Sequence, residues 1–275
     1  MKAEGIQRGV KNILRVRMTT FSIVTLNCCL WPIGIRATIN SALKDKRCTI
    51  IPKILEKADI GLCQEVLTWK LLDNKWIAIM QKYLKNYDWI YDTSSTLINS
   101  GLWTITRFTI VSQQFIIFNH TCLYSLTHPV GFLHTCMSIS NIQVHVINVH
   151  MLSDEAICVG DACLGKCFEG LYRKEIEQLV AYIETIDGNW IIGGDFNVNG
   201  DDLLIQWFVI QLKKRGKLSY FHPDVNTCND TSYANHTSKY LKVDHFYTNM
   251  EMKDCQVLYE NVSDHYPVMA TIVLP

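Results

Sequence analysis

Residues 190–197 read Trp-Ile-Ile-Gly-Gly-Asp-Phe-Asn, an apolar run followed at once by polar side chains. A short apolar run bounded by turn residues predicts a buried strand. Asp195 and Asn197 therefore lie where that strand ends. Taken alone, Gly-Gly-Asp-x-Asn also fits a tight turn followed by a helix cap. The interpretation depends on whether other segments repeat the pattern.

The pattern recurs at four other places along the chain. In each place, side chains with carboxylate, amide or imidazole groups border an apolar run of strand length. These residues are Asn27 after residues 21–26, Gln64 and Glu65 after 60–63, His150 after 144–149, and Asp264 and His265 before 268–274. Because loops at strand ends carry polar function on a rigid frame, we expect these groups to converge on one site.

The chemical types in this set suit the hydrolysis of a phosphodiester. Mg²⁺ prefers oxygen ligands and keeps several waters, so one or two carboxylates suffice to hold it. The carboxylates are Glu65, Asp195 and Asp264, and the amides are Asn27 and Asn197. His150 and His265 have side chains that bind phosphate oxygens or move protons near neutral pH. Each residue alone has an ordinary structural explanation, so the prediction rests on their combination.

The remaining patterns predict a layered fold rich in strands. Further apolar runs of strand length are 101–106, 110–118, 131–139, 243–247 and 256–259. Helical spacing of apolar residues occurs at 69–84 and 171–186, a helix end is expected at 52–57, and a further helix at 201–212. Many strands with a few interspersed helices predict two packed sheets flanked by helices.

Charge is balanced over the whole chain but not along it. The 275 residues include 26 basic and 26 acidic side chains, so no global field attracts polyanions. The N-terminal segment 1–20 is basic, with Lys2, Arg8, Lys11, Arg15 and Arg17 against Glu4. No repeat or linker divides the rest. We therefore expect a basic tail over 1–20 and one catalytic domain over 21–275.

The sequence contains neither a membrane-spanning run of about 18–20 apolar residues nor the apolar core of a signal peptide. We expect a cytoplasmic protein, peripheral to membranes if it meets them, whose 11 cysteines are mostly reduced. Residues 203–210 with the basic 213–215 form either an interfacial helix or a core-packed helix. The apolar Trp31-Pro32-Ile33 is a second candidate for a lipid-facing loop, and the oligomeric state stays open.

In order along the chain, these segments resemble the successive motifs of the endonuclease/exonuclease/phosphatase superfamily, the deoxyribonuclease-I-like proteins. The resemblance runs from about residue 21 to the C-terminus. The more specific motifs are Gly193-Gly194-Asp195-Phe196-Asn197 and Ser263-Asp264-His265-Tyr266-Pro267. The others are Thr25-Leu26-Asn27, Cys63-Gln64-Glu65-Val66, Ser100-Gly101-Leu102, Asn148-Val149-His150 and Val243-Asp244-His245. The resemblance implies an α+β fold, a four-layered α/β/β/α sandwich with a β-sandwich at its centre.

The resemblance also implies a metal site. Glu65 would be the principal ligand of Mg²⁺, supported by Asn27, with Asp264 in the same carboxylate cluster. Mn²⁺ stays open as an alternative ion.

The candidate catalytic residues follow from the same motifs. The resemblance implies that Asp195 and Asn197 position the attacking water and the phosphate. His150 and His265 would be the paired histidines. Asp244 would orient His265, because a carboxylate behind a histidine fixes its tautomer and favours its charged form.

Within the superfamily the chain is most similar to the neutral sphingomyelinases, through residues 144–155, 193–199 and 263–272. This implies a metal-dependent phosphodiesterase that splits sphingomyelin into ceramide and phosphocholine at a membrane surface. A deoxyribonuclease-like nuclease acting on nucleic acid and a phosphoinositide phosphatase stay open as alternatives. The sequence departs from the family at Val149, where Thr is usual, and at His245-Phe246, where Tyr-Ile is usual.

Overall fold

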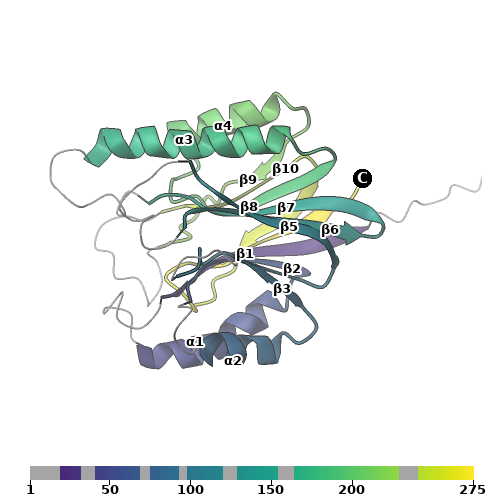
Figure 1. Cartoon of the computed structure of the whole chain (residues 1–275), viewed down its shortest axis with the longest axis vertical. Helices are drawn as coiled ribbons and strands as arrows, with labels where there is room; N and C mark the ends of the chain where they lie inside the picture. Colours follow the sequence, from purple (N-terminus) through teal and green to yellow (C-terminus); the bar gives the residue numbers. More distant parts are fainter. Residues whose placement is uncertain are drawn as a thin grey trace, which may run out of the picture.

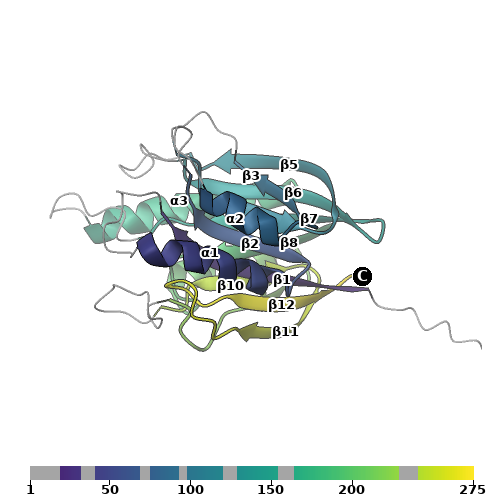
Figure 2. The same ribbon diagram turned by 90° about the horizontal axis from the view of Figure 1, so that it is seen from below.

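The apolar runs pair into two six-stranded sheets that face each other. The computed structural model describes residues 19–31, 41–68, 75–92, 98–119, 129–153, 164–228 and 241–275. Helices α1 (Ser41–Leu55) and α2 (Lys75–Tyr83) cover the outer face of one sheet, as Figures 1 and 2 show. Helices α3 (Leu164–Glu184) and α4 (Leu203–Lys213) cover the other (Figure 1). The predicted α/β/β/α sandwich is confirmed.

The strand order differs from the chain order in both sheets. The first sheet runs β11 (Glu251–Val257), β12 (Val268–Val273), β1 (Thr20–Leu30), β2 (Ile60–Val66), β4 (Trp103–Thr106) and β3 (Asp88–Tyr91). The second runs β5 (Thr109–Ile117), β6 (Gly131–Ile139), β7 (Ile142–His150), β8 (Asn189–Asp195), β10 (Asp244–Thr248) and β9 (Ser219–Phe221). Each sheet is mainly antiparallel but contains one parallel pair, and these two pairs place the candidate site.

The parallel pairs bring the carboxyl ends of their strands together. In the first sheet β1 and β2 are parallel, with Asn27 opposite Gln64. In the second sheet β7 and β8 are parallel, with His150 opposite Asp195. Strand β10 is antiparallel to β8 and starts beside it, because Asp244 lies opposite Asp195. Strand β12, antiparallel to β1, likewise starts at this edge. The predicted site residues thus gather at one end of the sandwich.

Three layers of apolar side chains hold the four layers of backbone together. Between the sheets, Ile23, Leu62, Val146 and Phe246 belong to one buried cluster. A second cluster joins α3 and α4 to the second sheet, and a third joins α1 and α2 to the first. Each sheet therefore buries one face against the other sheet and its other face against two helices. This burial of apolar faces is the condition for a stable layered domain.

Helix α1 confirms the helix end that the sequence predicted at 52–57. The structure has a helix of 15 residues that ends at Leu55, with Pro52 inside it. The missing N–H of Pro52 removes one helical hydrogen bond, and the bond from Glu56 N to Pro52 O at 2.8 Å continues the turn beyond it.

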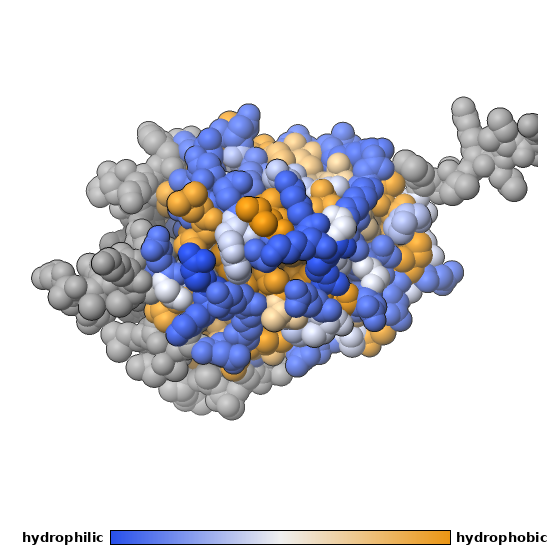
Figure 3. All heavy atoms as spheres, turned by 90° about the horizontal axis from the view of Figure 1, so that it is seen from above, coloured by the Kyte–Doolittle hydropathy of each residue, from blue (hydrophilic) through white to orange (hydrophobic). Residues whose placement is uncertain are grey.

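Helix α4 packs on the core, which resolves the two readings of residues 203–210. Leu204, Ile205, Phe208 and Val209 are buried against α3 and the second sheet. The outer face over α3 and α4 is largely hydrophilic with scattered hydrophobic residues (Figure 3). Among the described helices none is long and apolar enough to cross a membrane. Residues 1–18 of the predicted basic tail lie outside the described residues.

Substitution of Gly194 tests the close approach of strands β7 and β8. Its φ is 149°, and a β carbon added there would lie 2.0 Å from the carbonyl oxygen of Val149 on β7. We expect Gly194→Ala to lower the free energy of unfolding by about 3 kcal/mol or more, measured by urea denaturation. Gly188→Ala is the matched control, because Gly188 also has a positive φ but meets nothing within 4 Å. That change should cost only about 1–2 kcal/mol, and equal losses at both positions would contradict the prediction.

Candidate active site

Asp195 lies at the centre of the site. Its Oδ2 accepts a hydrogen bond from Asn27 Nδ2 at 2.9 Å and lies 3.6 Å from His150 Nε2 and 3.8 Å from His265 Nε2. Its Oδ1 accepts from the backbone N–H of Asn197 at 2.8 Å. The residue is 1% exposed. One buried carboxylate oxygen is thus surrounded by three nitrogen atoms from separate segments of the chain.

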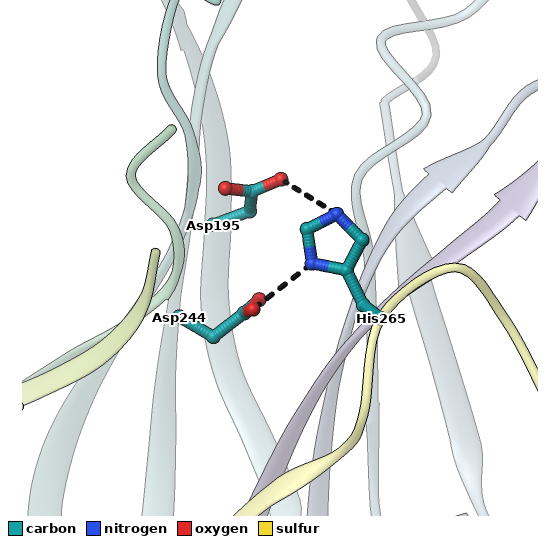
Figure 4. Close-up of side chains that lie close together, drawn as sticks. All are labelled: Asp195, Asp244 and His265. Carbon is teal, nitrogen blue, oxygen red and sulfur yellow. Dashed lines mark hydrogen bonds and ion pairs between the residues drawn. The ribbon is translucent and has the colours of Figure 1, made fainter. Parts of the chain in front are cut away.

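His265 is fixed between two carboxylates (Figure 4). Its Nδ1 lies 2.9 Å from Asp244 Oδ2, and its Nε2 points toward Asp195. Asp244 is fully buried at the start of β10, whereas His265 enters from the segment before β12. The carboxylate of Asp244 therefore fixes both the orientation of the imidazole and the proton on Nδ1.

The electrostatics favour a charged pair at this position. Burial lowers the pKa of His265, but attraction by Cys228, Asp244 and Asp195 outweighs burial and raises that pKa well above its ordinary value. Burial raises the pKa of Asp244, and His265 opposes this rise. At neutral pH His265 is then an imidazolium that carries a proton at Nε2, the atom that faces Asp195.

Glu65 and His150 lie where the site reaches solvent. His150 Nε2 is 3.9 Å from Glu65 Oε1, and the two side chains are 18% and 12% exposed. Glu65 has a φ of 54°, which few non-glycine residues adopt. Gly101 leaves room for this backbone, because a β carbon there would lie 3.2 Å from the α carbon of Glu65. The strain marks Glu65 as a residue whose position the surrounding structure imposes.

Trp31 corrects the prediction of a lipid-facing loop. Its indole N–H donates to Glu65 Oε2, and the residue is 5% exposed. Trp31 therefore supports the carboxylate of Glu65 from within the protein. Pro32 and Ile33, the rest of that candidate loop, lie outside the described residues.

Ser263 links Asn27 to Asp264 beside the end of β1. Ser263 Oγ donates to the backbone oxygen of Asn27 at 2.6 Å and lies 3.0 Å from Asp264 Oδ1. The side-chain oxygen of Asn27 accepts from Cys29 N at 3.1 Å and keeps a second lone pair. The structure thus joins Asn27 to Asp264 through Ser263 and to Asp195 directly.

The described part contains one group of side chains close enough to hold a metal ion, which differs from the ligand set that the sequence predicted. Asp195, Asp244 and His265 have ligand atoms within 4.8 Å of one another. That group includes a ring nitrogen already bonded to Asp244, and Mg²⁺ prefers oxygen ligands to imidazole. The predicted ligands Glu65, Asn27 and Asp264 would each present an oxygen atom, the ligand type that Mg²⁺ prefers with water completing its shell. The donor chemistry therefore fits Mg²⁺ at Glu65 better.

Several contacts among these residues cross from one sheet to the other, whereas His150 and Asp195 lie in the same sheet. Asn27 and Glu65 belong to the first sheet and approach Asp195 and His150 of the second. His265, attached to the first sheet through β12, approaches Asp195 of the second in the same way. All eight predicted site residues lie in the described part, and the structure brings them together as one inter-sheet cluster.

Two supporting residues were not predicted. Asn148 is fully buried and donates to the backbone oxygens of Cys63 and Trp103 at 3.1 and 3.0 Å, while its own oxygen accepts from Gln64 Nε2 at 2.7 Å. Arg47 is fully buried too and donates to backbone oxygens at Cys28 and Val262. Asn148 interrupts an apolar run, and this polar residue in a predicted buried strand could have indicated a buried hydrogen-bonding role. Nothing in the sequence around Arg47 indicates its role.

Comparison with known proteins identifies the fold. No family model and no curated protein sequence matches the chain. Solved structures do match, among them a magnesium-bound mutant of beta toxin from Staphylococcus aureus, with 18% identity, a TM-score of 0.67, and coverage of 92% of this chain and 99% of that one. Sphingomyelinase C from Streptomyces griseocarneus matches with 16% identity, a TM-score of 0.66, and coverage of 92% and 99%. An endonuclease/exonuclease/phosphatase family protein from Bacteroides thetaiotaomicron matches with 17% identity and a TM-score of 0.65. The match covers 94% of this chain and 96% of that one.

These matches define the class of fold. The structural neighbours include a sphingomyelinase C and endonuclease/exonuclease/phosphatase family proteins, and the chain has the deoxyribonuclease-I-like fold. At this level of identity the likeness concerns the fold alone.

Other histidines of the described part lie outside the site and have structural partners. His134 Nδ1 lies 2.8 Å from the hydroxyl of Tyr182, and its Nε2 lies 2.9 Å from His145 Nδ1. His222 Nε2 lies 2.9 Å from the hydroxyl of Tyr247. Burial lowers the pKa of His134 and of His222 to about 4. These residues are neutral at physiological pH and help to build the core.

This burial generates a prediction about acid stability. A histidine whose pKa is about 4 in the folded state and about 6.5 when unfolded stabilises the fold fully above pH 6.5, and this contribution is lost as the pH falls toward 4. Each such histidine adds about 1.4 kcal/mol per pH unit to the slope in that window. Urea denaturation at successive pH values should show His134→Phe with a shallower slope than the parent protein. An unchanged slope would contradict the lowered pKa of His134.

Proposed function

We propose that this chain is a Mg²⁺-dependent phosphodiester hydrolase. The observation that carries the proposal is the set of nitrogen atoms around Asp195 Oδ2, from Asn27, His150 and His265. This arrangement holds a carboxylate and two imidazoles within reach of one reacting group. Such a combination can orient water, bind phosphate oxygens and transfer protons.

The residues then have distinct roles. Asp195 and Asn197 position the attacking water and the phosphate, and His265 moves a proton at Nε2 while Asp244 holds its Nδ1. His150, which is partly exposed, binds or protonates a phosphate oxygen. The pH dependence of kcat/KM in His150 and His265 variants would show which histidine donates the proton and which accepts it.

The metal would be held by oxygen atoms at the end of β1 and β2. Glu65 is the main ligand in this proposal, with Asn27 and Asp264 beside it. Bound Mg²⁺ supplies Lewis-acid stabilisation of the negative charge that develops on the leaving oxygen. Mn²⁺, which accepts the same ligand types, is the alternative ion.

Sphingomyelin is the proposed substrate, cleaved to ceramide and phosphocholine at a membrane surface. Support comes from the motifs shared with neutral sphingomyelinases and from the likeness to solved sphingomyelinases. A nuclease or a phosphoinositide phosphatase shares the same site chemistry, so the substrate must be separated by experiment. The proposed cellular place is the cytoplasm, with peripheral attachment to membranes.

The first experiment compares substrates side by side. Purified protein is given sphingomyelin vesicles, plasmid DNA or phosphoinositide vesicles, each with Mg²⁺ and with EDTA. We expect Mg²⁺-dependent release of phosphocholine, intact DNA, and a loss of about 10²–10⁴-fold in His265→Ala. His134→Gln, at a buried histidine outside the site, should keep its rate. DNA cleavage or phosphoinositide turnover without phosphocholine release would overturn the proposed substrate.

Glu65 allows a separate test of the metal site. Glu65→Gln keeps the shape of the side chain but removes its charge, so we expect Mg²⁺ to bind at least about 10-fold more weakly. Isothermal titration of the protein with Mg²⁺ measures this without relying on turnover. The exposed Glu56→Gln is the matched control. Equal Mg²⁺ affinity in both variants would remove Glu65 from the ligand set.

A further inference from the structure

The segment 195–200 carries two of the site residues and is anchored from outside. The backbone oxygen of Asp195 accepts from Met151 N at 3.0 Å. The backbone oxygen of Phe196 accepts from the hydroxyl of Tyr172 at 2.7 Å. Because the chain turns sharply here, each anchor limits where the side chains of this segment point.

Asn197 is the strained point of this turn. Its φ is 53°, in the left-handed region that few non-glycine residues adopt. Its backbone N–H donates to Asp195 Oδ1, and its side-chain Nδ2 donates to Met151 O, both at 2.8 Å. Such a conformation persists only where neighbouring contacts determine it. Contacts of the next residue, Val198, therefore also help to keep Asn197 in this conformation.

His245 provides the anchor for Val198. Its Nε2 lies 3.0 Å from the backbone oxygen of Val198, and the residue is fully buried on β10, opposite Gly194. Its Nδ1 is buried and has no hydrogen-bond partner among the described atoms. The proton must sit on Nε2, because only an N–H can bond to a carbonyl oxygen, and Nδ1 is then a bare acceptor. His245 is thus a neutral imidazole with one defined donor.

The buried environment of His245 indicates that its N–H donor has a structural role. The ring lies among other rings, with centroid distances of 4.8 Å to His222 and 5.5 Å to Phe196. A phenylalanine would fill this space without burying an unpaired nitrogen, which carries a desolvation cost. The hydrogen bond to the Val198 oxygen is the contact of His245 that a phenylalanine could not make.

We infer that His245 is a positioning residue, which holds the Asn197–Val198 turn through its hydrogen bond to the Val198 oxygen and so keeps Asp195 and Asn197 in register with the reacting phosphate. The inference rests on the proposed function of the site. His245 acts through Val198, because its ring nitrogen reaches that backbone oxygen and its side chain is fully buried.

The test compares His245→Phe with His245→Gln. Phenylalanine keeps the ring but removes the donor, whereas the amide of glutamine restores an N–H at similar reach. We expect kcat of His245→Phe to fall about 10–100-fold with KM little changed, because misplacement by about 1 Å has that effect. Hydrogen exchange of peptides covering 196–202 should be faster in His245→Phe. His245→Gln should recover both, and His134→Phe, the matched control, should alter neither.

Each outcome decides the inference. Unchanged kcat and unchanged exchange in His245→Phe would overturn it, as would a failure of glutamine to restore what phenylalanine loses. If the parent protein hydrolyses no phosphodiester, the proposed function fails, and the exchange comparison alone decides the role of His245. If His245→Phe does not fold, His245→Asn, whose amide is too short to reach Val198, takes its place against His245→Gln.

Discussion

The buried amide of Asn148 connects the two sheets directly behind the site. It bonds to backbone oxygens of β2 and β4 and to the side chain of Gln64, all in the opposite sheet. Apolar packing between sheets is not directional and allows sliding, whereas an amide with three fixed partners does not. A buried polar network of this kind is costly unless complete, so it defines one distance and one register between the sheets. The positions of Glu65 and His150, one residue beyond Gln64 and two beyond Asn148, depend on that register.

A second constraint fixes the two strands of the second sheet. Gly194 lets β7 and β8 approach where a side chain would collide with the carbonyl oxygen of Val149. That approach places His150 opposite Asp195. Close backbone packing, more than any property of the polar residues themselves, thus sets the distance between these two groups. The side chain of Val149, next to His150, is buried and packs in the core behind the site.

Much of the site could be predicted because it follows the ends of apolar runs, which are readable without a structure. Asn27, Glu65, His150 and Asp195 all obey that rule. Arg47 and Trp31 do not, because their roles depend on backbone oxygens and a carboxylate that come close only in the folded chain. The short strands β3 and β9 were also missed, since a few residues carry too little periodic pattern. What the sequence could not reveal was chiefly which distant groups meet.

Two of the shortest contacts within the site bridge the two sheets, so the geometry of the site depends on how tightly the sheets pack. Expanded states of proteins can keep helices and strands while losing fixed packing between layers. In such a state the pairs His265–Asp244 and Asn27–Asp195, each 2.9 Å apart, would separate although no strand had melted. The proposed hydrolytic activity should therefore be sensitive to the packing between the two sheets. It would fade in mild denaturant ahead of any change in the circular dichroism of the backbone.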